Sequence, residues 1–173
     1  MMKKFNYKSQ MAVPKIAKVV VNAGFGRMVS AGVSKDKEKI QENIVQVLSS
    51  ITGQKPTLRP AKKSIAAFKL REGIPIGAMV TLRKKRMYDF LEKLIWVVLP
   101  RMRDFRGIVL KSFDENGNLA IGFKEYVPFP EVLLEREKMV FGLEVIVNTT
   151  SKNKEEGVEL LRLMGFPLQK DSR

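Results

Sequence analysis

The 173-residue sequence contains neither cysteine nor histidine. Without cysteine the chain can form no disulfide and offers no thiol nucleophile, and without both residues it cannot build a zinc site of the Cys/His type. Histidine is also the commonest general base and the usual partner of a serine nucleophile, so its absence argues against catalysis. These absences favour a binding or structural protein that is not an enzyme and carries no metal and no cofactor.

Long apolar runs are also missing. The longest, at residues 94–99, is far shorter than the ~20 residues that a membrane-spanning helix requires. The N-terminal residues carry charge but lack the apolar core of a secretory signal. We therefore expect a soluble, intracellular protein with no membrane partner.

Acidic residues are scarce in one stretch of the chain. Residues 55–86 contain ten Lys and Arg against one acidic residue, Glu72, which amounts to +9 of the total net charge of +14. The rest of the chain, with 22 basic and 17 acidic residues, contributes +5. A pI near 10.1 with clustered charge is typical of a protein that binds a phosphate backbone. An anionic membrane surface attracts the same charge, so composition alone does not choose between the two.

Aromatic residues are equally scarce in this stretch. Phe68 is the only one in residues 55–86, and nothing resembles the aromatic motif of an RNA-recognition domain. Stacking on single-stranded bases is therefore disfavoured. Recognition of folded RNA through its shape, backbone and 2′-hydroxyls fits better, with Asn22, Gln54 and Thr81 making the specific hydrogen bonds.

The basic residues themselves allow two interpretations. The run of four at residues 83–86 is, by itself, most simply a solvated cluster. A compact sheet would bring Lys62, Lys63, Lys69 and Arg71 near it, and together these residues favour contact with phosphates. Such contacts give salt-dependent affinity but carry no sequence information.

The segment Gly24-Phe25-Gly26 follows a predicted strand and invites comparison with a dinucleotide-binding fingerprint. That fingerprint requires a third glycine where this chain has Val29, and we expect no helix to open directly after the segment. Either the segment is a tight turn that needs glycine at positive φ, or its bare N–H groups approach a phosphate.

Carboxylate pairs such as the one at residues 155 and 156 look like solvated surface, not a catalytic pair.

Hydrophobic periodicity and chain-breaking residues predict three helices among short strands. The expected helices span residues 34–52, 87–99 and about 154–164; Pro100 stops the second, in which Trp96 is expected to be a packing residue. The expected strands span residues 15–22, 57–59, 64–70, 78–83, 119–123 and 142–150, with a loop at 71–77 and an Asn-Gly turn at 114–118. The fold predicted from this order is α+β: a single-domain sandwich over residues 1–173, with helices packed on one face of a mainly antiparallel sheet.

The ordered pieces also resemble a known family. The chain resembles the bacterial-type large-subunit ribosomal protein L-five family, the 5S rRNA-binding proteins, in the successive segments VPKIAKVVVNAGFG, ITGQKP, AKKSIAAFKLREGIPIGAMVTLR, LPRMRDFRG, SFDENGNLAIGFKE, FPE and GFPLQK. The resemblance runs from about Phe5 to Lys170, which is nearly the whole chain.

This resemblance implies a structural constituent of the large ribosomal subunit, in the ribosomes of the cytoplasm or of an organelle. The implied partners are 5S rRNA and 23S-type rRNA in the central protuberance, the elbow of the P-site tRNA, and neighbouring ribosomal proteins, among them a small-subunit head protein in an intersubunit bridge. The implied 5S rRNA contacts are Asn22, Gly24, Gln54, Lys55, Thr81 and Arg83. A long basic loop at residues 62–77 would reach the tRNA through Lys62, Lys63, Ser64, Lys69, Arg71, Ile74 and Pro75.

Two alternatives from other classes stay open at this point. An RNA-modifying enzyme would place a catalytic Asp or Lys in a pocket beside the basic loop. A DNA-packaging protein would bind duplex DNA with comparable affinity and little selectivity.

Overall fold

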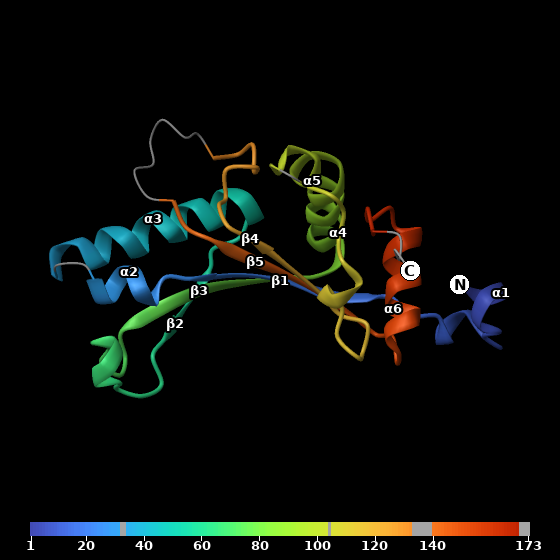
Figure 1. Cartoon of the computed structure of the whole chain (residues 1–173), viewed down its shortest axis with the longest axis horizontal. Coiled ribbons are helices and arrows are strands. Elements are labelled where there is room, and N and C mark those ends of the chain that lie inside the picture. Colours follow the sequence, from blue (N-terminus) through green and yellow to red (C-terminus); the bar gives the residue numbers. More distant parts are fainter. Residues whose placement is uncertain (32–33, 104, 133–139, 170–173) are drawn as a thin grey trace. The chain divides into compact units, whose positions relative to one another are not determined.

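Five strands of the computed structural model, which describes residues 1–31, 34–103, 105–132 and 140–169, form one sheet (Figure 1). The strand order is β2 (Thr57–Pro60), β3 (Pro75–Leu82), β1 (Ile16–Gly24), β5 (Leu143–Thr149) and β4 (Leu119–Phe123). The predicted α+β class with a mainly antiparallel sheet is confirmed. The chain divides into two compact units: unit 1 holds Met1–Val20, Leu82–Ile121 and Val145–Arg173, and unit 2 holds Val21–Thr81 and Gly122–Glu144. The single domain stays a prediction.

Helix α3 (Ser34–Thr52) is the longest element of unit 2 and matches the predicted helix. Its apolar side chains at helical spacing are buried, as predicted: Ile40, Ile44, Val47, Leu48 and Ile51. Gly53 follows at φ 63°, a left-handed conformation that glycine adopts easily, and its N–H donates to the Ser49 carbonyl oxygen at 2.8 Å. Within unit 2, α3 therefore supplies one apolar face and ends where a glycine allows it to end.

Strands β2 and β3 pair in the antiparallel direction. β3 begins at Pro75, so the interpretation of residues 75–77 as loop was wrong. A proline has no N–H for the ladder, but Pro75 lies opposite Pro60 at the end of the pairing, next to a register shift, where a missing donor costs little. The loop was predicted from two glycines and one proline at residues 71–77, and Pro75 and Gly77 instead belong to the end of a strand pair.

The strand predicted at residues 64–70 is also wrong. Ile65 and Leu70 exchange two backbone hydrogen bonds, of 3.0 and 3.2 Å, around a 3-10 turn at Ala66–Phe68 (η2). Lys69 closes this turn in the left-handed conformation, at φ 50°. The apolar residues that suggested a strand are the two sides of a tight turn, which leaves no length for a ladder.

Strand β1 runs to Gly24, two residues beyond the predicted end, and helix α2 (Gly26–Ala31) opens after Phe25. Two expectations are therefore wrong: a helix does follow the Gly-Phe-Gly segment, and neither Gly24 nor Gly26 has a positive φ. The dinucleotide fingerprint still lacks its third glycine, because Val29 is buried at that position.

In unit 1 the second predicted helix is a continuous run of α4 (Lys84–Lys93), the π-helical η3 (Leu94–Val98) and α5 (Leu99–Arg101). It passes Pro100, where the prediction stopped it. Proline lacks a donor and its ring crowds the preceding turn, and the wide π turn just before Pro100 accommodates both effects. The predicted apolar residues are buried: Met87, Phe90, Leu91, Leu94, Ile95, Val98 and Leu99.

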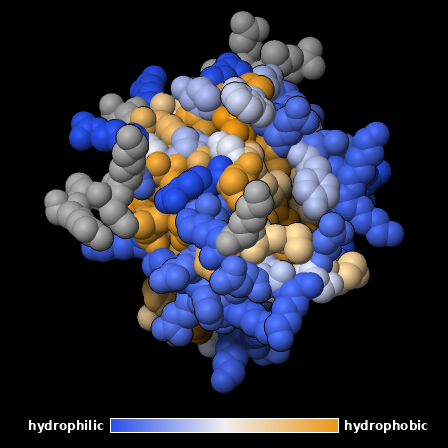
Figure 2. All heavy atoms as spheres, turned by 90° about the vertical axis from the view of Figure 1, so that its right-hand side faces the viewer, coloured by the Kyte–Doolittle hydropathy of each residue, from blue (hydrophilic) through white to orange (hydrophobic). Residues whose placement is uncertain are grey.

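Trp96 was wrongly expected to be a packing residue. Its side chain is 73% exposed. The buried residues Leu94, Ile95, Val98 and Leu99 occupy the inner side of this helical run, and Trp96 lies on the outer side. Figure 2 shows one face of the molecule, on which hydrophobic side chains are exposed between hydrophilic ones.

The rest of unit 1 follows the sequence prediction closely. The Asn-Gly turn leads into β4, with Gly117 at φ 75° and the Asn118 N–H bonded to the Asp114 carboxylate at 2.7 Å. Helix α6 (Lys154–Leu163) packs tightly on this turn, since a Cβ at Gly157 would lie 2.5 Å from the Gly117 Cα. The remaining short helices are α1 (Met2–Phe5), η1 (Gln10–Ala12) and η4 (Leu110–Ser112). None of the described helices is long and apolar enough to cross a membrane.

Candidate nucleic-acid interface

Three of the predicted 5S rRNA contacts share one face of the unit 2 strands. Along β1 the buried Val21 and Ala23 alternate with Asn22 and Gly24, and Thr81 follows the same alternation along β3. Because successive side chains of a strand point to opposite faces, Asn22, Gly24 and Thr81 lie on the face away from the buried core. β1 and β3 are neighbours in the sheet, so the three positions lie on adjacent strands.

The side chains of Asn22 and Thr81 are available to a ligand. Both residues are half-buried, and neither side chain has a hydrogen-bond partner among the described residues. Partly buried polar groups are normally paired, with protein, water or a ligand. An amide and a hydroxyl that the described protein leaves unpaired, at fixed positions on strands, are suited to hydrogen-bond a rigid partner.

The strand register adds two residues that sequence reasoning missed. Thr57 lies opposite Met79 and Arg59 lies opposite Gly77, and directly opposite residues of an antiparallel pair share a face. We call this face of unit 2 the open face; it is made by Asn22, Gly24, Thr57, Arg59, Gly77, Met79 and Thr81. Arg59 is exposed and gives this face a cation. A four-residue strand is too short to show its alternation, so only the pairing identifies these two residues.

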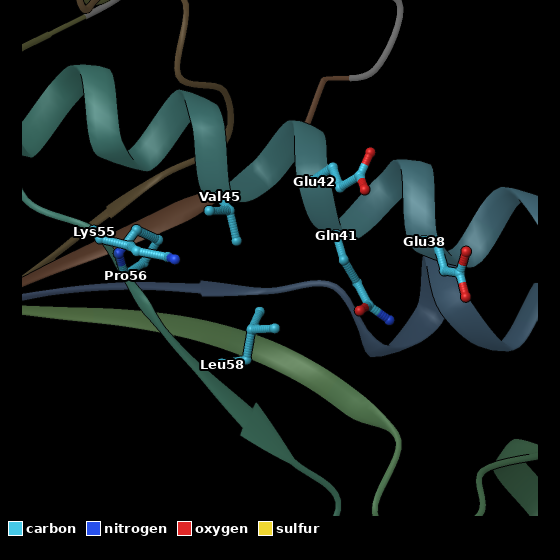
Figure 3. Close-up of a pocket in the computed structure, with 7 residues that line it drawn as sticks. All are labelled: Glu38, Gln41, Glu42, Val45, Lys55, Pro56 and Leu58. Carbon is cyan, nitrogen blue, oxygen red and sulfur yellow. The ribbon is translucent and has the colours of Figure 1, made fainter.

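Gln54 and Lys55 precede β2, and the Gln54 carbonyl oxygen accepts a hydrogen bond from the Thr52 hydroxyl at 3.1 Å. Lys55 borders a hollow of about 290 Å³ between α3 and β2 (Figure 3). In Figure 3, Gln41 and Val45 from α3 and Leu58 from β2 point into the space between the helix and the strand. Leu58 alternates with the open-face residues of β2, so the hollow lies on the α3 side of the strand. The structure therefore places Lys55 apart from the open face.

Two acidic residues border the same hollow. Glu38 and Glu42 of α3 line it together with Lys55 and Pro56. Negative charge at this position repels phosphate, so the α3 side of β2 is less suited to RNA than the open face.

Arg83, the sixth predicted 5S rRNA contact, belongs to unit 1 and is exposed. It follows β3 directly, and Lys84, at φ 54°, turns the chain into α4. This left-handed conformation is uncommon for a lysine. Lys85 and Arg86 are exposed as well, so the four-residue basic run is accessible to phosphate from its first residue to its last.

The basic loop comprises residues 61–74, between β2 and β3, and ends before the predicted limit at residue 77 (Figure 1). Among the predicted tRNA contacts, Lys62, Lys63, Lys69 and Arg71 are all exposed. The loop is closed at its base, where the Ala61 N–H donates to the Ile74 carbonyl oxygen at 2.9 Å.

The other three predicted tRNA contacts help to hold the loop in place. The Ser64 hydroxyl oxygen accepts a hydrogen bond from the Glu72 N–H at 2.9 Å and so braces the loop. Ile74 and Pro75 are half-buried at its base, and Pro75 is already part of β3. The loop therefore presents four cations at its surface and keeps these three residues for its own support.

Among the described residues, the carboxyl groups with shifted pKa values lie in unit 1, far along the sequence from the basic loop. Glu156 accepts a hydrogen bond from the Lys152 N–H at 3.0 Å, which holds the pKa of its carboxyl below the ordinary value, with help from the Tyr7 hydroxyl. Burial, and then the neighbouring Glu156, raise the pKa of Tyr7 to about 12. The buried Tyr7 hydroxyl has no hydrogen-bond partner among the described residues, so its interaction with Glu156 is electrostatic. The interpretation of residue 156 as merely solvated was wrong.

A second carboxylate of α6 is paired with a different partner. Lys4 of α1 reaches Glu159 at 2.7 Å, and this contact holds the pKa of Glu159 below its ordinary value. Both shifts follow from bonds that attach the N-terminal segment and a turn to α6. Over the described residues, no group of three or more Asp and Glu side chains is placed to hold a metal ion.

Fold and site together define a class. A basic α+β protein that presents unpaired polar side chains on one sheet face and exposed cations on the loop between β2 and β3 is built to bind a polyanion with a fixed shape. A sequence model described as "Ribosomal protein L5" matches residues 9–71, and a second model, for the C-terminus of the same ribosomal protein family, matches residues 75–168. The chain is also 50% identical, over 167 residues, to the protein "Large ribosomal subunit protein uL5" of Halothermothrix orenii, covering 96% of this chain and 90% of that relative.

The chain therefore belongs to the ribosomal protein L5 family, as its segment order suggested. Proteins of this family are structural constituents of the ribosome, so the expectations of a ribosomal, RNA-binding protein that is not an enzyme are confirmed.

Proposed function

We propose that this ribosomal protein of the large subunit binds 5S rRNA with the open face of unit 2. Asn22 and Thr81 supply hydrogen bonds to fixed points of the RNA, Gly24 lets its backbone come close, and Arg59 pairs with a phosphate. Gln54, Lys55 and Arg83 extend the contact beyond the open face. In this proposal the protein is part of the central protuberance, next to 23S-type rRNA.

The observation that carries the proposal is the unpaired state of Asn22 and Thr81 within the described protein. Their side chains are half-buried on adjacent strands, where desolvation is already partly complete and the geometry is fixed. A phosphate-binding surface alone would need only exposed cations, which the chain already has in the basic loop. Uncharged groups held in a half-buried position are instead the groups that discriminate between RNA structures.

The basic loop has a separate role in the proposal. Lys62, Lys63, Lys69 and Arg71 contact the elbow of the P-site tRNA through phosphates, while Ser64, Ile74 and Pro75 hold the loop in place. A further surface meets a small-subunit head protein and contributes to an intersubunit bridge. Exposed side chains around a closed loop support the tRNA contact, because cations at the surface are accessible to phosphates.

A competition experiment tests the proposal. Labelled 5S rRNA is bound to the full chain and displaced by unlabelled 5S rRNA, by an unrelated folded RNA of equal length, or by duplex DNA, across a salt series. We expect 5S rRNA to compete best at every salt concentration, with the advantage growing as salt screens the phosphate contacts. Equal competition by duplex DNA would instead favour a DNA-packaging protein and overturn the proposal.

Thr81→Val sharpens the same experiment. The substitution keeps the shape of the side chain and removes the hydroxyl, so the RNA group that it pairs with is left unsatisfied at a cost of about 1–3 kcal/mol. We expect weaker 5S rRNA binding at constant salt with an unchanged melting temperature. Unchanged affinity would remove Thr81 from the interface.

A further inference from the structure

Unit 2 has a second hollow, and Gly24 is the one residue of its lining that belongs to the RNA contacts proposed above. The hollow has a volume of about 580 Å³ and lies between the start of α2 and the tip of the basic loop. Its lining is mainly apolar, with Phe68 and Leu70 from the loop, Ile76 from β3, and Met28 from α2. A hollow of this size accommodates a small planar group and the sugar attached to it.

Phe68 gives the hollow an aromatic wall. Its side chain is 64% exposed, although the neighbouring Leu70 is half-buried. An aromatic ring on a hydrogen-bonded turn, with one side uncovered, offers a flat surface that a second ring can stack on. The bonds between Ile65 and Leu70 hold this turn, so the ring projects from a defined support.

The charges around the hollow favour a nucleotide over a protein side chain. Among the described residues that line it, Arg27 is the one that carries a charge, and none is a carboxylate. A base that enters the hollow would therefore bring its phosphate next to Arg27, whereas a cationic peptide would be repelled by that residue.

Gly24 connects the hollow to the open face. It lies two residues beyond Asn22 on the same face of β1 and also lines the hollow. No atom of the described protein comes within 4 Å of the position that a Cβ would take there, and its φ is not positive, so nothing within that part of the chain requires glycine at this position. The missing side chain leaves the backbone open to close approach by a partner.

We propose that this hollow holds one unpaired base of 5S rRNA, stacked on Phe68, with Arg27 at the phosphate. The proposal rests on the proposed function, because it takes the RNA of the open face past Gly24 into the hollow. It also modifies the sequence-based interpretation: one aromatic residue is too few for a single-strand platform but sufficient for one flipped base.

The test measures 5S rRNA affinity for Phe68→Ala, Phe68→Leu and Phe68→Tyr. Base–aromatic stacking removed by truncation corresponds to roughly a 10- to 100-fold weaker affinity. We expect that loss for Phe68→Ala, a large part of it for Phe68→Leu, which is apolar but has no π face, and near wild-type affinity for Phe68→Tyr. Ile65→Ala is the matched control, because Ile65 is exposed on the same loop but does not line the hollow.

A fluorescence measurement gives an independent readout. The chain has a single tryptophan, so Phe68→Trp in a Trp96→Phe background places the only indole at the hollow. We expect 5S rRNA to quench its emission and an unrelated duplex RNA to leave it unchanged. Quenching by a tRNA instead of 5S rRNA would overturn the assignment of the base to 5S rRNA.

The outcomes separate this inference from the proposed function. If Thr81→Val weakens 5S rRNA binding while Phe68→Ala matches Ile65→Ala, the open face binds RNA and the hollow does not. If the unmodified chain shows no preference for 5S rRNA, the proposed function fails, and this inference fails with it. Equal losses for Phe68→Ala and Phe68→Tyr would also overturn stacking as the cause.

Discussion

The open face and the basic loop of unit 2 present opposite kinds of surface. On the open face, half-buried, uncharged side chains such as Asn22 and Thr81 are held by strands, and Arg59 is the one cation among the residues that define it. On the loop, Lys62, Lys63, Lys69 and Arg71 are exposed on a short segment closed at its base. The first surface offers uncharged groups in half-buried positions and little charge, and the second offers exposed charges at the ends of long side chains.

This difference indicates how the two surfaces divide the work of RNA binding. Exposed cations attract any polyanion, and their contribution falls as salt rises. Half-buried hydrogen-bonding groups contribute only when the partner offers the complementary group at the right place, and they depend little on salt. We therefore expect selectivity to come from the open face, although most of the charge of unit 2 lies elsewhere.

The largest expected effect comes from removing both polar groups of the open face. Asn22→Ala combined with Thr81→Val should weaken 5S rRNA binding by about 100-fold or more, because each unsatisfied partner costs about 1–3 kcal/mol. The loss should persist at high salt, as measured by filter binding across a salt series. A loss that disappears at high salt would mean that these side chains act only through the charges around them.

Substitutions at two glycines distinguish an effect on stability from an effect on RNA binding. Gly157→Ala should lower the free energy of unfolding by roughly 3 kcal/mol, because the added methyl group would overlap the Gly117 backbone. Gly24→Ala should change it by less than about 0.5 kcal/mol, since that position is open, but should weaken 5S rRNA binding by roughly 10-fold. Chemical denaturation and RNA titration measure the two quantities. Equal stability losses would show that Gly24 is also structural.

Removing charge from the basic loop should change tRNA binding and leave 5S rRNA binding nearly unchanged. Lys62→Ala with Lys63→Ala should leave 5S rRNA affinity within about threefold, while the slope of log affinity for tRNA against log salt decreases by about 1.5, because two phosphates are no longer neutralised. Lys84→Ala with Lys85→Ala removes the same charge from unit 1 and is the matched control. Loss of 5S rRNA binding in the loop variant would contradict the division between the two surfaces.

The smallest expected effect concerns unit 1 and depends on pH. The lowered pKa of Glu156 means that its contribution to stability is present above the ordinary carboxyl value of about 4.3 and is lost as pH falls through the lowered value. The raised pKa of Tyr7 means that its contribution is present below about 10 and is lost as pH rises toward about 12.

Glu156→Gln tests the contribution of the Glu156 carboxylate. It should cost about 1 kcal/mol at neutral pH and flatten the acid side of the melting-temperature profile, because the charge-assisted hydrogen bond is gone. Glu155→Gln, at the exposed neighbouring position, should change little. Since all of these groups belong to unit 1, 5S rRNA binding at neutral pH should stay near wild type in both variants, which keeps the stability of unit 1 separate from the chemistry of the open face.

Sequence reasoning predicted the long, strongly periodic elements well. The bounds of α3 agree at both ends, because five aliphatic residues repeat at helical spacing and Gly53 ends the run. Sequence reasoning was wrong where local composition and long-range pairing favour different structures. A strand begins at Pro75 because Pro60 lies opposite, at the end of the pairing. Ile65 and Leu70 do not form a strand because they pair with each other across a turn. No local pattern contains information about the opposite strand.

The residues of the candidate site were also predicted only in part. Asn22, Gly24 and Thr81 were predicted, and alternation along β1 and β3 places them on one face. Thr57 and Arg59 were missed, and Lys55 was grouped with residues from which the structure separates it. Exposure of Trp96 and the bonded role of Glu156 were missed as well, since both depend on which side of a helix meets a neighbouring segment.

The sequence alone determined the class of this protein. Missing cysteine and histidine, a concentrated excess of positive charge and the ordered family segments are properties of the chain that folding does not change. The tertiary structure decided which polar groups of the described chain are left unpaired, which glycines have open space around them, and that Phe68 stands at the edge of a hollow. These properties arise only when strands and loops distant in the sequence come together, because burial and pairing are relations between residues and not properties of any one of them.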